Sequence, residues 1–335
     1  EHLTWFKWES YATWMSGFVL LAIVYYAGAD LFLIDRNVLD IPVWAGIVLS
    51  AGSLALGWIV YDQLCKSPLG NHDTLLMIVL YAIVVFMAWG YTQLFTGRAA
   101  FLHLGAFTAT IMSANVFMII IPNQKIVVAD LIAGRKPDPK YGKIAKTRST
   151  HNNYLTLPVL FLMLSNHYPL AFATPYNWAI ASLVFLMGVT IRHFFNTMHA
   201  RKGKPWWTWI ATAVIFLVIV WLSTIPRADA ETDDAATLTP AQQRFAEAPQ
   251  FDAVRDTVLG RCSMCHTAEP AWDGIIAPPR GVILDTDEAI ARHAKEIYLQ
   301  AGITHAMPPA NVSYIEPAER QVLIDWYRGV AGGAS

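Results

Sequence analysis

Hydrophobic and polar positions are distributed unevenly along this chain. In its first two-thirds, seven apolar segments each approach the roughly 20 residues that an α-helix needs to cross about 30 Å of hydrocarbon. They are approximately Thr13–Phe32, Val43–Tyr61, Leu75–Leu94, Ala99–Ile121, Tyr154–Phe172, Trp178–Met198 and Trp206–Ile225. The pattern predicts a polytopic helical membrane bundle of seven spans. The fifth segment is the most polar of the set, because it contains Pro158, Asn166 and His167.

The last third of the chain has a different pattern. Residues 227–240 are rich in Ala, Asp and Thr, a composition that cannot build a hydrophobic core and predicts a flexible acidic linker. Residues 241–335 predict three amphipathic helices: one that runs into Cys262, one over Asp287–Gln300 and one over Pro317–Gly329. We therefore expect an all-α protein with a membrane domain at 1–226 and a soluble helical domain at 241–335.

Composition and charge add an orientation to this picture. The chain is 55% hydrophobic and only 15% charged, against about 25% charged in ordinary soluble proteins. Residues 1–227 hold 16 Lys/Arg and 9 Asp/Glu (+7), whereas residues 228–335 hold 8 and 16 (−8). One set of predicted loops carries 12 positive residues and the opposite set carries three, Arg36, Arg98 and Arg227. The positive-inside rule then makes the first set cytoplasmic and places the soluble domain on the opposite side of the membrane, in the periplasm. We expect no nucleic-acid partner.

The most specific motif is Cys262-Ser263-Met264-Cys265-His266. A C-x-x-C-H sequence attaches c-type haem, with both thiols bound to the haem vinyl groups and the histidine bound to iron. Met307, 41 residues after His266, is the expected sixth ligand, since His plus Met ligation is typical of cytochromes c. A zinc site is the alternative, but zinc usually takes four protein ligands and the sequence has no second cysteine pair.

With this motif, residues 241–335 resemble a class I cytochrome c. In that family the first and last helices cross and the haem lies in a crevice lined by loops. The resemblance implies that a carbonyl in a proline-containing loop orients the proximal histidine, a role for which Pro278 or Pro279 is available.

Several ionisable residues lie in or beside the predicted spans, where their cost makes each a functional-site hypothesis. Arg192, Asn196 and His199 share one helical stripe, with His193 beside it and His151–Asn153 at the same membrane face. Arginine binds planar anions through its fork, and histidine moves protons near neutral pH. The alternative is helix-end snorkelling and hydrogen bonding between helices.

His103 and His167 lie instead near the predicted periplasmic ends of the fourth and fifth spans. Two histidines at one depth predict ligands for an intramembrane haem b. The alternative interpretation is that both are interfacial residues.

Four segments carry a resemblance that covers the whole chain. Glu1–Ser10, Ile121–Lys125, His151–Pro158 and Cys262–His266 are similar to the membrane-bound, cytochrome c-fused urate oxidases (urate hydroxylases) of bacterial purine degradation. The resemblance implies oxidation of urate to 5-hydroxyisourate, with electrons passed to the protein's own haem c. Members of that family begin with a further helix that contains a Trp-Leu-His motif, so we expect the chain to be an N-terminally truncated form.

The resemblance to this family implies roles for the polar residues. Arg192 is the expected clamp for the urate anion, the expected proton acceptor is one of His193, His199 and His151, and the expected readers of the urate amide edges are Asn152, Asn153 and Asn196. The acidic haem domain should pass electrons to a basic periplasmic cytochrome or a terminal oxidase. The alternative function is a non-catalytic, membrane-anchored cytochrome c that serves another dehydrogenase, although one helix would suffice to anchor it.

Overall fold

The computed structural model describes residues 2–35, 39, 41–165, 171, 174, 176–224, 238–275 and 277–332. Its regular elements are helical, with one isolated β-bridge between Ile34 and Phe95. The chain divides into two compact units, Glu1–Ile225 and Pro226–Ser335. The elements of the first unit are α1 (His2–Leu21), η1 (Ala22–Tyr26), α2 (Ala29–Phe32), α3 (Val43–Lys66), η2 (Pro68–Asn71), α4 (Asp73–Leu94), α5 (Gly97–Ala114), η3 (Asn115–Ile120), α6 (Ile121–Ile132), α7 (Pro139–Leu164), α9 (Asn177–His199) and α10 (Trp207–Thr224).

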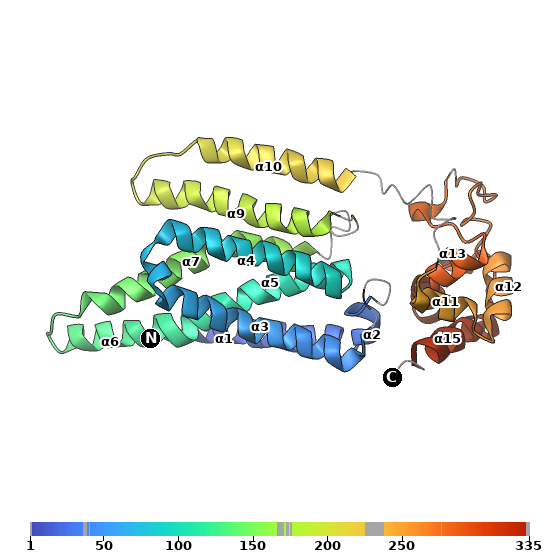
Figure 1. The fold of residues 1–335 in the computed structure, drawn as a ribbon, viewed down its shortest axis with the longest axis horizontal. Helices are drawn as coiled ribbons and strands as arrows, with labels where there is room; N and C mark the ends of the chain where they lie inside the picture. The colour runs from blue at the N-terminus through green and yellow to red at the C-terminus, as the bar shows by residue number, and fades with distance from the viewer. Residues whose placement is uncertain are drawn as a thin grey trace. The chain divides into compact units, whose positions relative to one another are not determined.

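The first unit is an elongated bundle in which the long helices run side by side (Figure 1). α6 and the beginning of α7 form a hairpin that extends past one end of the bundle. Five helical stretches are long and apolar enough to cross a membrane: Val43–Lys66, Asp73–Leu94, Gly97–Ile132, Asn177–His199 and Trp207–Thr224. The unit is therefore compatible with a multi-pass membrane protein.

All seven predicted segments fall on helices, but two of these helices are not among the five apolar ones. The first segment covers the end of α1, the π-helical turn η1 and the short α2. The fifth falls in the second half of α7, whose first half is polar, and its last residues lie mostly outside the described part of the chain. Seven spans therefore remain a prediction.

Local sequence explains where the key helices begin. The Thr96 hydroxyl accepts a hydrogen bond from the Ala99 N–H at 3.2 Å and caps α5. Asp138 caps α7 by accepting from the Lys140 N–H at 2.8 Å, and Pro139 follows at the first helical position. Both arrangements satisfy backbone donors that the first helical turn leaves unpaired.

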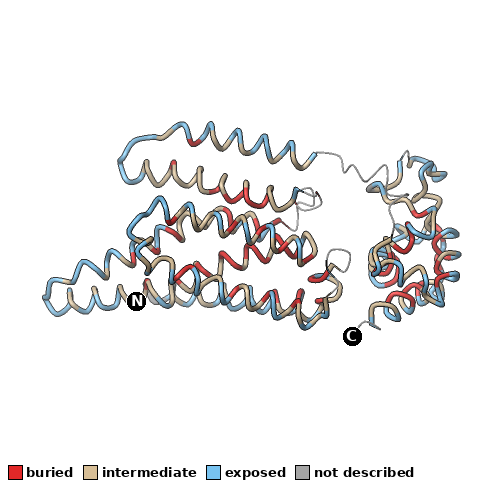
Figure 2. The backbone as a smooth tube through the Cα atoms, viewed as in Figure 1, coloured by how far each residue is buried: buried red, intermediate tan, exposed pale blue. Residues whose placement is uncertain are grey.

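The buried residues of the first unit lie along the middle helices, whereas α6 and α10 are mostly exposed (Figure 2). The largest fully buried side chains there are Leu33, Ile34, Leu76, Tyr91, Phe95, Phe101, Leu104, Leu162 and Ile180. Large apolar side chains such as Leu56, Phe86 and Leu217 are exposed on the outside. An apolar exterior of this extent is typical of a lipid-facing surface.

Close helix contacts in this bundle depend on two glycines. A Cβ atom at Gly188 of α9 would lie 2.6 Å from Cδ of Pro158 in α7, and one at Gly57 of α3 would lie 2.0 Å from the ring of Phe107 in α5. Small residues at such contacts allow membrane helices to approach closely. Gly188 therefore fixes how α9 packs on α7, the two helices that carry the polar residues described below.

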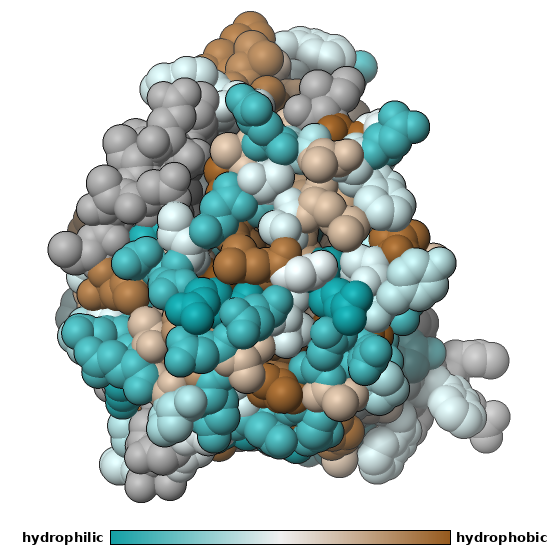
Figure 3. Space-filling model, turned by 90° about the vertical axis from the view of Figure 1, so that its right-hand side faces the viewer, coloured by the Kyte–Doolittle hydropathy of each residue, from teal (hydrophilic) through white to brown (hydrophobic). Residues whose placement is uncertain are grey.

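The second unit contains α11 (Pro240–Ala246), α12 (Phe251–Arg261), η7 (Pro279–Gly281), α13 (Asp287–Arg292), α14 (Ala294–Ile297), η8 (Tyr298–Ile303), η9 (Pro309–Asn311) and α15 (Pro317–Gly332). α12 packs against α15, where Phe251 contacts the fully buried Trp326 and Arg261 binds Glu319 at 3.0 Å. The predicted helices before Cys262 and from Pro317 are confirmed. The predicted helix from Asp287 is broken at His293 into α13, α14 and η8. The face drawn in Figure 3 is mostly hydrophilic.

Candidate functional site

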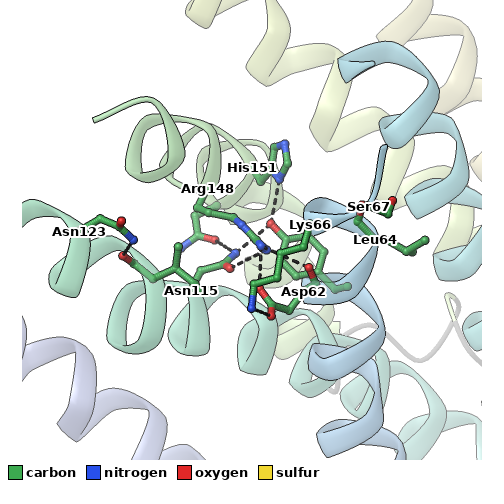
Figure 4. A network of polar contacts seen from close by, with 11 residues as sticks. Asp62, Leu64, Lys66, Ser67, Asn115, Asn123, Arg148 and His151 are labelled. Atoms are coloured by element: carbon green, nitrogen blue, oxygen red, sulfur yellow. Dashed lines mark hydrogen bonds and ion pairs between the residues drawn. The ribbon is translucent and has the colours of Figure 1, made fainter. Parts of the chain in front are cut away.

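One buried polar group joins α3, η3 and α7 (Figure 4). The Arg148 guanidinium, nearly inaccessible to solvent, binds Asp62 Oδ1 through Nη2 at 2.7 Å. The exposed Lys66 ammonium binds the other oxygen of Asp62 at 2.5 Å. We call this group, which also contains Tyr61, Asn115, His151 and Asn152, the Arg148 network. Its two cations and one carboxylate leave it one positive charge.

The hydrogen bonds of the Arg148 network have one direction. Arg148 can only donate, so its bond of 3.3 Å to Asn115 fixes the amide oxygen of Asn115 on that side. The Asn115 amide nitrogen then donates to the Tyr61 hydroxyl at 3.0 Å. The Tyr61 hydroxyl oxygen and Nδ1 of His151 are 2.8 Å apart. In the arrangement that continues the same direction, Tyr61 donates to Nδ1 and a neutral His151 carries its proton on Nε2.

The same amide nitrogen of Asn115 also donates to Oδ1 of Asn152 at 3.0 Å, and the Asn152 amide nitrogen donates to the Met112 carbonyl at 2.8 Å. Both ends of the Asn152 side-chain amide therefore already have hydrogen-bond partners within the bundle.

A second polar group lies between α7, α9 and α10. Nε of Arg192 donates to Oδ1 of Asn153 at 2.6 Å. Nδ1 of His193 is 2.9 Å from the Tyr154 hydroxyl, and the His193 ring centroid is 6.0 Å from that of Trp207. Within the part of the chain that the structure describes, the two terminal amino groups of Arg192 have no hydrogen-bond partner. This set, the Arg192 group, thus combines an oriented guanidinium fork with a neighbouring histidine that has an aromatic ring beside it.

The structure brings together only some of the residues that the sequence predicted as one site. Asn153, Arg192 and His193 lie together, but His151 and Asn152 belong to the Arg148 network. The reason is helical geometry, because His151 and Asn153 are two residues apart and lie about 200° apart around α7. Asn196 and His199 lie farther along α9 and form no hydrogen bond with either group among the described residues.

Sequence reasoning missed Tyr61, Asp62 and Arg148. Arg148 is one of the 12 positive residues of the predicted loops, but it lies within α7 and is buried. The available signal was the spacing of Arg148, His151 and Asn152 at i, i+3 and i+4, which places all three on one helix face. Asp62, directly after an apolar segment, was the acidic partner to test.

His103 does not offer a free nitrogen to a haem iron. Its ring is completely buried, Nδ1 donates to the Ala99 carbonyl at 2.7 Å, and Nε2 therefore accepts from the Ser50 hydroxyl at 2.7 Å. The Tyr26 hydroxyl is also 2.9 Å from that of Ser50. Iron ligation at Nε2 would require displacement of Ser50. His167, the other predicted haem b ligand, lies outside the described residues.

The Cys262–His266 segment follows α12 as a turn in which the His266 N–H donates to the Cys262 carbonyl at 3.0 Å. Cys262 and Cys265 are free thiols rather than a disulfide. Burial raises the pKa of Cys262 to about 11, and the pKa of Cys265 is also raised by burial. Nδ1 of His266 donates to the Val282 carbonyl at 3.0 Å, which leaves Nε2 available as a ligand. The orienting carbonyl is that of Val282, not that of Pro278 or Pro279.

These residues fit a covalent haem. Two free thiols and a histidine with one nitrogen already oriented form the donor set of such a site. Large apolar side chains are exposed on the same unit, namely Leu259, Trp272, Ile303, Met307 and Tyr314, and a haem would cover apolar surface. Among the described residues, the buried Ser313 hydroxyl has no hydrogen-bond partner. The described residues contain no group of three or more His, Cys, Asp or Glu side chains that could hold a metal ion alone.

Comparison with known proteins concerns the first unit. The model of the family described as "Urate oxidase N-terminal" matches residues 1–223. No curated protein and no solved structure matches the chain. The matched range contains both the Arg148 network and the Arg192 group, and it ends before the second unit. Since it covers most of the chain, the protein belongs to the urate oxidase N-terminal family.

Proposed function

We propose that this protein is a membrane urate oxidase that converts urate to 5-hydroxyisourate and delivers the electrons to a haem c on its own second unit. The family match over residues 1–223 is the observation that carries the proposal. The Cys262–His266 motif and its fit to haem support the electron route. In this reaction urate and one water give 5-hydroxyisourate, two protons and two electrons, so the haem must be reduced twice per turnover.

The Arg192 group is the proposed urate site. Urate is a planar anion, and the unpartnered terminal amino groups of Arg192 can donate two parallel hydrogen bonds to it. Asn153 holds the guanidinium in place through Nε. Trp207, close to His193, can stack on a purine ring.

The remaining predicted residues keep proposed roles at or near this site. His193 is the foremost proton acceptor, because it adjoins Arg192 in α9 and its Nδ1 already contacts Tyr154. Asn196 and the exposed His199 lie one and two turns farther along α9 and line the approach to it. His151 and Asn152 belong to the Arg148 network on another face of α7, so their proposed role is to support the site and not to contact urate.

Charge indicates the electron acceptor and the location. The second part of the chain, residues 228–335, has 8 Lys/Arg against 16 Asp/Glu, which favours a basic cytochrome or a terminal oxidase as partner. A bacterial inner membrane with the haem unit in the periplasm agrees with the seven Lys/Arg of residues 125–148, on the side predicted to be cytoplasmic. When bound, haem c supplies one-electron redox chemistry with His266 and Met307 as iron ligands.

An electron route across the membrane is a separate proposal. The Arg192 group lies at the end of α9, near His199, which is the predicted cytoplasmic end, whereas the haem is periplasmic. An intramembrane haem b at His103 and His167 would shorten the distance, at the cost of the Ser50 hydrogen bond. A pyridine haemochrome spectrum of the full-length protein tests this relay, and a spectrum with c-type haem alone contradicts it.

Urate-driven haem reduction tests the proposed function. Purified full-length protein with oxidised haem should show the reduced c-type spectrum after urate is added without oxygen. Reduction by dithionite but not by urate would leave only the alternative, a membrane-anchored cytochrome c that serves another dehydrogenase. Arg192→Ala should abolish the urate-driven reduction and keep the dithionite spectrum. Lys202→Ala, an exposed change just beyond α9, should alter neither and serves as the control.

A further inference from the structure

α15 contains an arginine whose contacts lie next to the proposed haem ligands. Arg320 is buried and donates through Nη1 to the carbonyls of Ala301 and Met307, the latter at 3.0 Å. Its Nη2 donates to Oδ1 of Asn311 at 3.3 Å. One side chain thus joins α15 to η8, to the Met307 segment and to η9.

The acceptors of Arg320 are neutral. Among the described residues no carboxylate pairs with it, because the adjacent Glu319 binds Arg261 with both oxygens 3.0 Å from Nε. A buried cation that has only carbonyl and amide partners is costly to maintain. Because the guanidinium donates to the carbonyl of Met307, the proposed iron ligand, its charge lies beside the proposed haem.

Close packing keeps Arg320 within reach of these acceptors. A Cβ atom at Gly302 in η8 would lie 3.0 Å from Cγ1 of Ile324, one turn after Arg320. η8 can therefore approach α15 closely enough for the Ala301 carbonyl to accept from Arg320. The same guanidinium nitrogen then holds the Met307 carbonyl, and so the backbone that carries the Met307 thioether.

We propose that Arg320 is a positioning residue of the haem unit: it holds the Met307 segment in place for iron ligation, and its uncompensated charge stabilises the reduced haem. This inference rests on the proposed haem c. Loss of the guanidinium frees the Met307 backbone, so the thioether is displaced more easily by other ligands. Loss of the charge lowers the reduction potential, since reduction adds an electron to the site.

The test uses full-length protein with haem attached. In Arg320→Gln, the weak red-edge absorption band that reports methionine bound to ferric haem should weaken or disappear, and imidazole should bind the ferric haem about tenfold more tightly. The midpoint potential should fall. Arg328→Gln is the matched control, because Arg328 lies two turns further along α15 and, among the described residues, bonds only the Tyr298 side chain, at 3.2 Å. It should leave the band, the imidazole affinity and the potential unchanged.

Arg320→Lys keeps the charge but not the forked donors. It should retain most of the potential while binding imidazole more tightly than the parent, and it covers the case in which Arg320→Gln does not fold. Identical bands, affinities and potentials in Arg320→Lys and the parent would overturn the positioning role. A parent chain that shows no c-type spectrum would overturn the haem assignment itself, a result separate from any effect of Arg320.

Discussion

Three arginines of this protein differ in what surrounds the guanidinium group. Arg148 is buried against the carboxylate of Asp62. Arg192 is partly buried and keeps its terminal amino groups without a partner among the described residues. Arg320 is buried against carbonyls. The first arrangement is a structural ion pair, the second is suited to bind an anionic ligand, and the third is suited to order a chain segment.

The buried pair predicts a large effect on stability. Arg148→Met removes one partner and leaves the buried Asp62 carboxylate with Lys66 alone. The free energy of unfolding should fall by about 3 kcal/mol, the lower end of the range for a broken buried pair. The measurement is an equilibrium unfolding titration of the purified protein in mixed detergent micelles.

The control for that change is a pair of the same type on the surface. Arg135 binds Asp130 at 2.7 Å, but its side chain is 66% exposed. Arg135→Met should lower the free energy of unfolding by less than about 1 kcal/mol. Equal losses for the two variants would contradict the structural role of the Arg148 pair.

The direction of the hydrogen bonds around Asn115 predicts the protonation of His151. Asn115→Asp replaces the amide donor by an acceptor, so the Tyr61 hydroxyl would donate to Asp rather than to His151. The proton of neutral His151 should move from Nε2 to Nδ1. Nitrogen NMR of histidine-labelled protein, assigned with His151→Gln, reports which nitrogen is protonated.

Asn123→Asp is the control, since within the described part of the chain the Asn123 amide bonds only the Ile119 carbonyl of its own helical stretch. It should leave the His151 signals unchanged. A parent protein with the His151 proton on Nδ1, or a folded Asn115→Asp protein without the shift, would show that the Arg148 network does not set this proton.

Burial of the Cys262 thiol predicts a pH dependence in protein that lacks haem. Its pKa is raised from 9.0 to about 11 in the folded state, so folding disfavours the thiolate. The stabilising contribution is complete below pH 9 and is lost as pH rises from about 9 to 11. In full-length protein that lacks haem, the melting temperature of the second unit should therefore fall as the pH rises over that range. The haem-loaded protein, whose sulfurs are thioethers, should not show this loss.

At the scale of helices, the irregular turns coincide with polar groups. Each described π-helical segment carries a residue that takes part in such a polar group. η1 carries Tyr26, which bonds Ser50, and η3 begins with Asn115 of the Arg148 network. η8 contains Ala301, whose carbonyl accepts from Arg320. A wider helical turn changes which residues face inward and is frequent at functional sites. The hydrophobic pattern predicts the helices but not these turns, because a π-helical turn does not change the local composition.

The same limit explains which site residues could be predicted. Hydropathy identifies the apolar helices and, within them, expensive residues such as Arg192 and His193. It does not reveal that α7 extends into the polar segment that contains Arg148. The partners of Arg148 lie on α3 and η3, far away in sequence. Only the packing of three helices makes Asp62, Asn115 and Arg148 one network.

The contact between α7 and α9 predicts the effect of a single methyl group. Gly188→Ala would place Cβ 2.6 Å from the Pro158 ring, whereas Gly90→Ala in α4 meets nothing within 4 Å. Gly188→Ala should lower the free energy of unfolding by about 1–3 kcal/mol, as overpacking does. Gly90→Ala should be neutral or slightly stabilising. Thermal unfolding in detergent compares the two, and matching melting temperatures would contradict the close contact.

At the scale of the whole molecule, the division into an apolar and an acidic part could be read from composition, and the structure places the boundary at Ile225–Pro226. The attachment motif could be read as well. The carbonyl of Val282 and the guanidinium of Arg320 could not, because each acts on a residue far from it in sequence.

The proposed topology predicts which positions reagents reach from each side. Lys136→Cys places a thiol in the exposed turn between α6 and α7, and Glu269→Cys places one on the surface of the second unit. A membrane-impermeant maleimide on intact spheroplasts should label position 269 at once and position 136 only after permeabilisation. Cys65→Ser provides a background without the remaining native thiol. The opposite labelling pattern would invert the topology and place the haem unit in the cytoplasm.

Consecutive residues of α7 serve different neighbours: Asn152 bonds Asn115, whereas Asn153 bonds Arg192. A one-residue insertion or deletion between Arg148 and Asn152 would rotate Arg148 by about 100° relative to the two asparagines. The three side chains could then no longer all reach their partners on the neighbouring helices. The number of residues from Arg148 to Tyr154 therefore cannot change by small insertions or deletions, as the lengths of loops do during evolution.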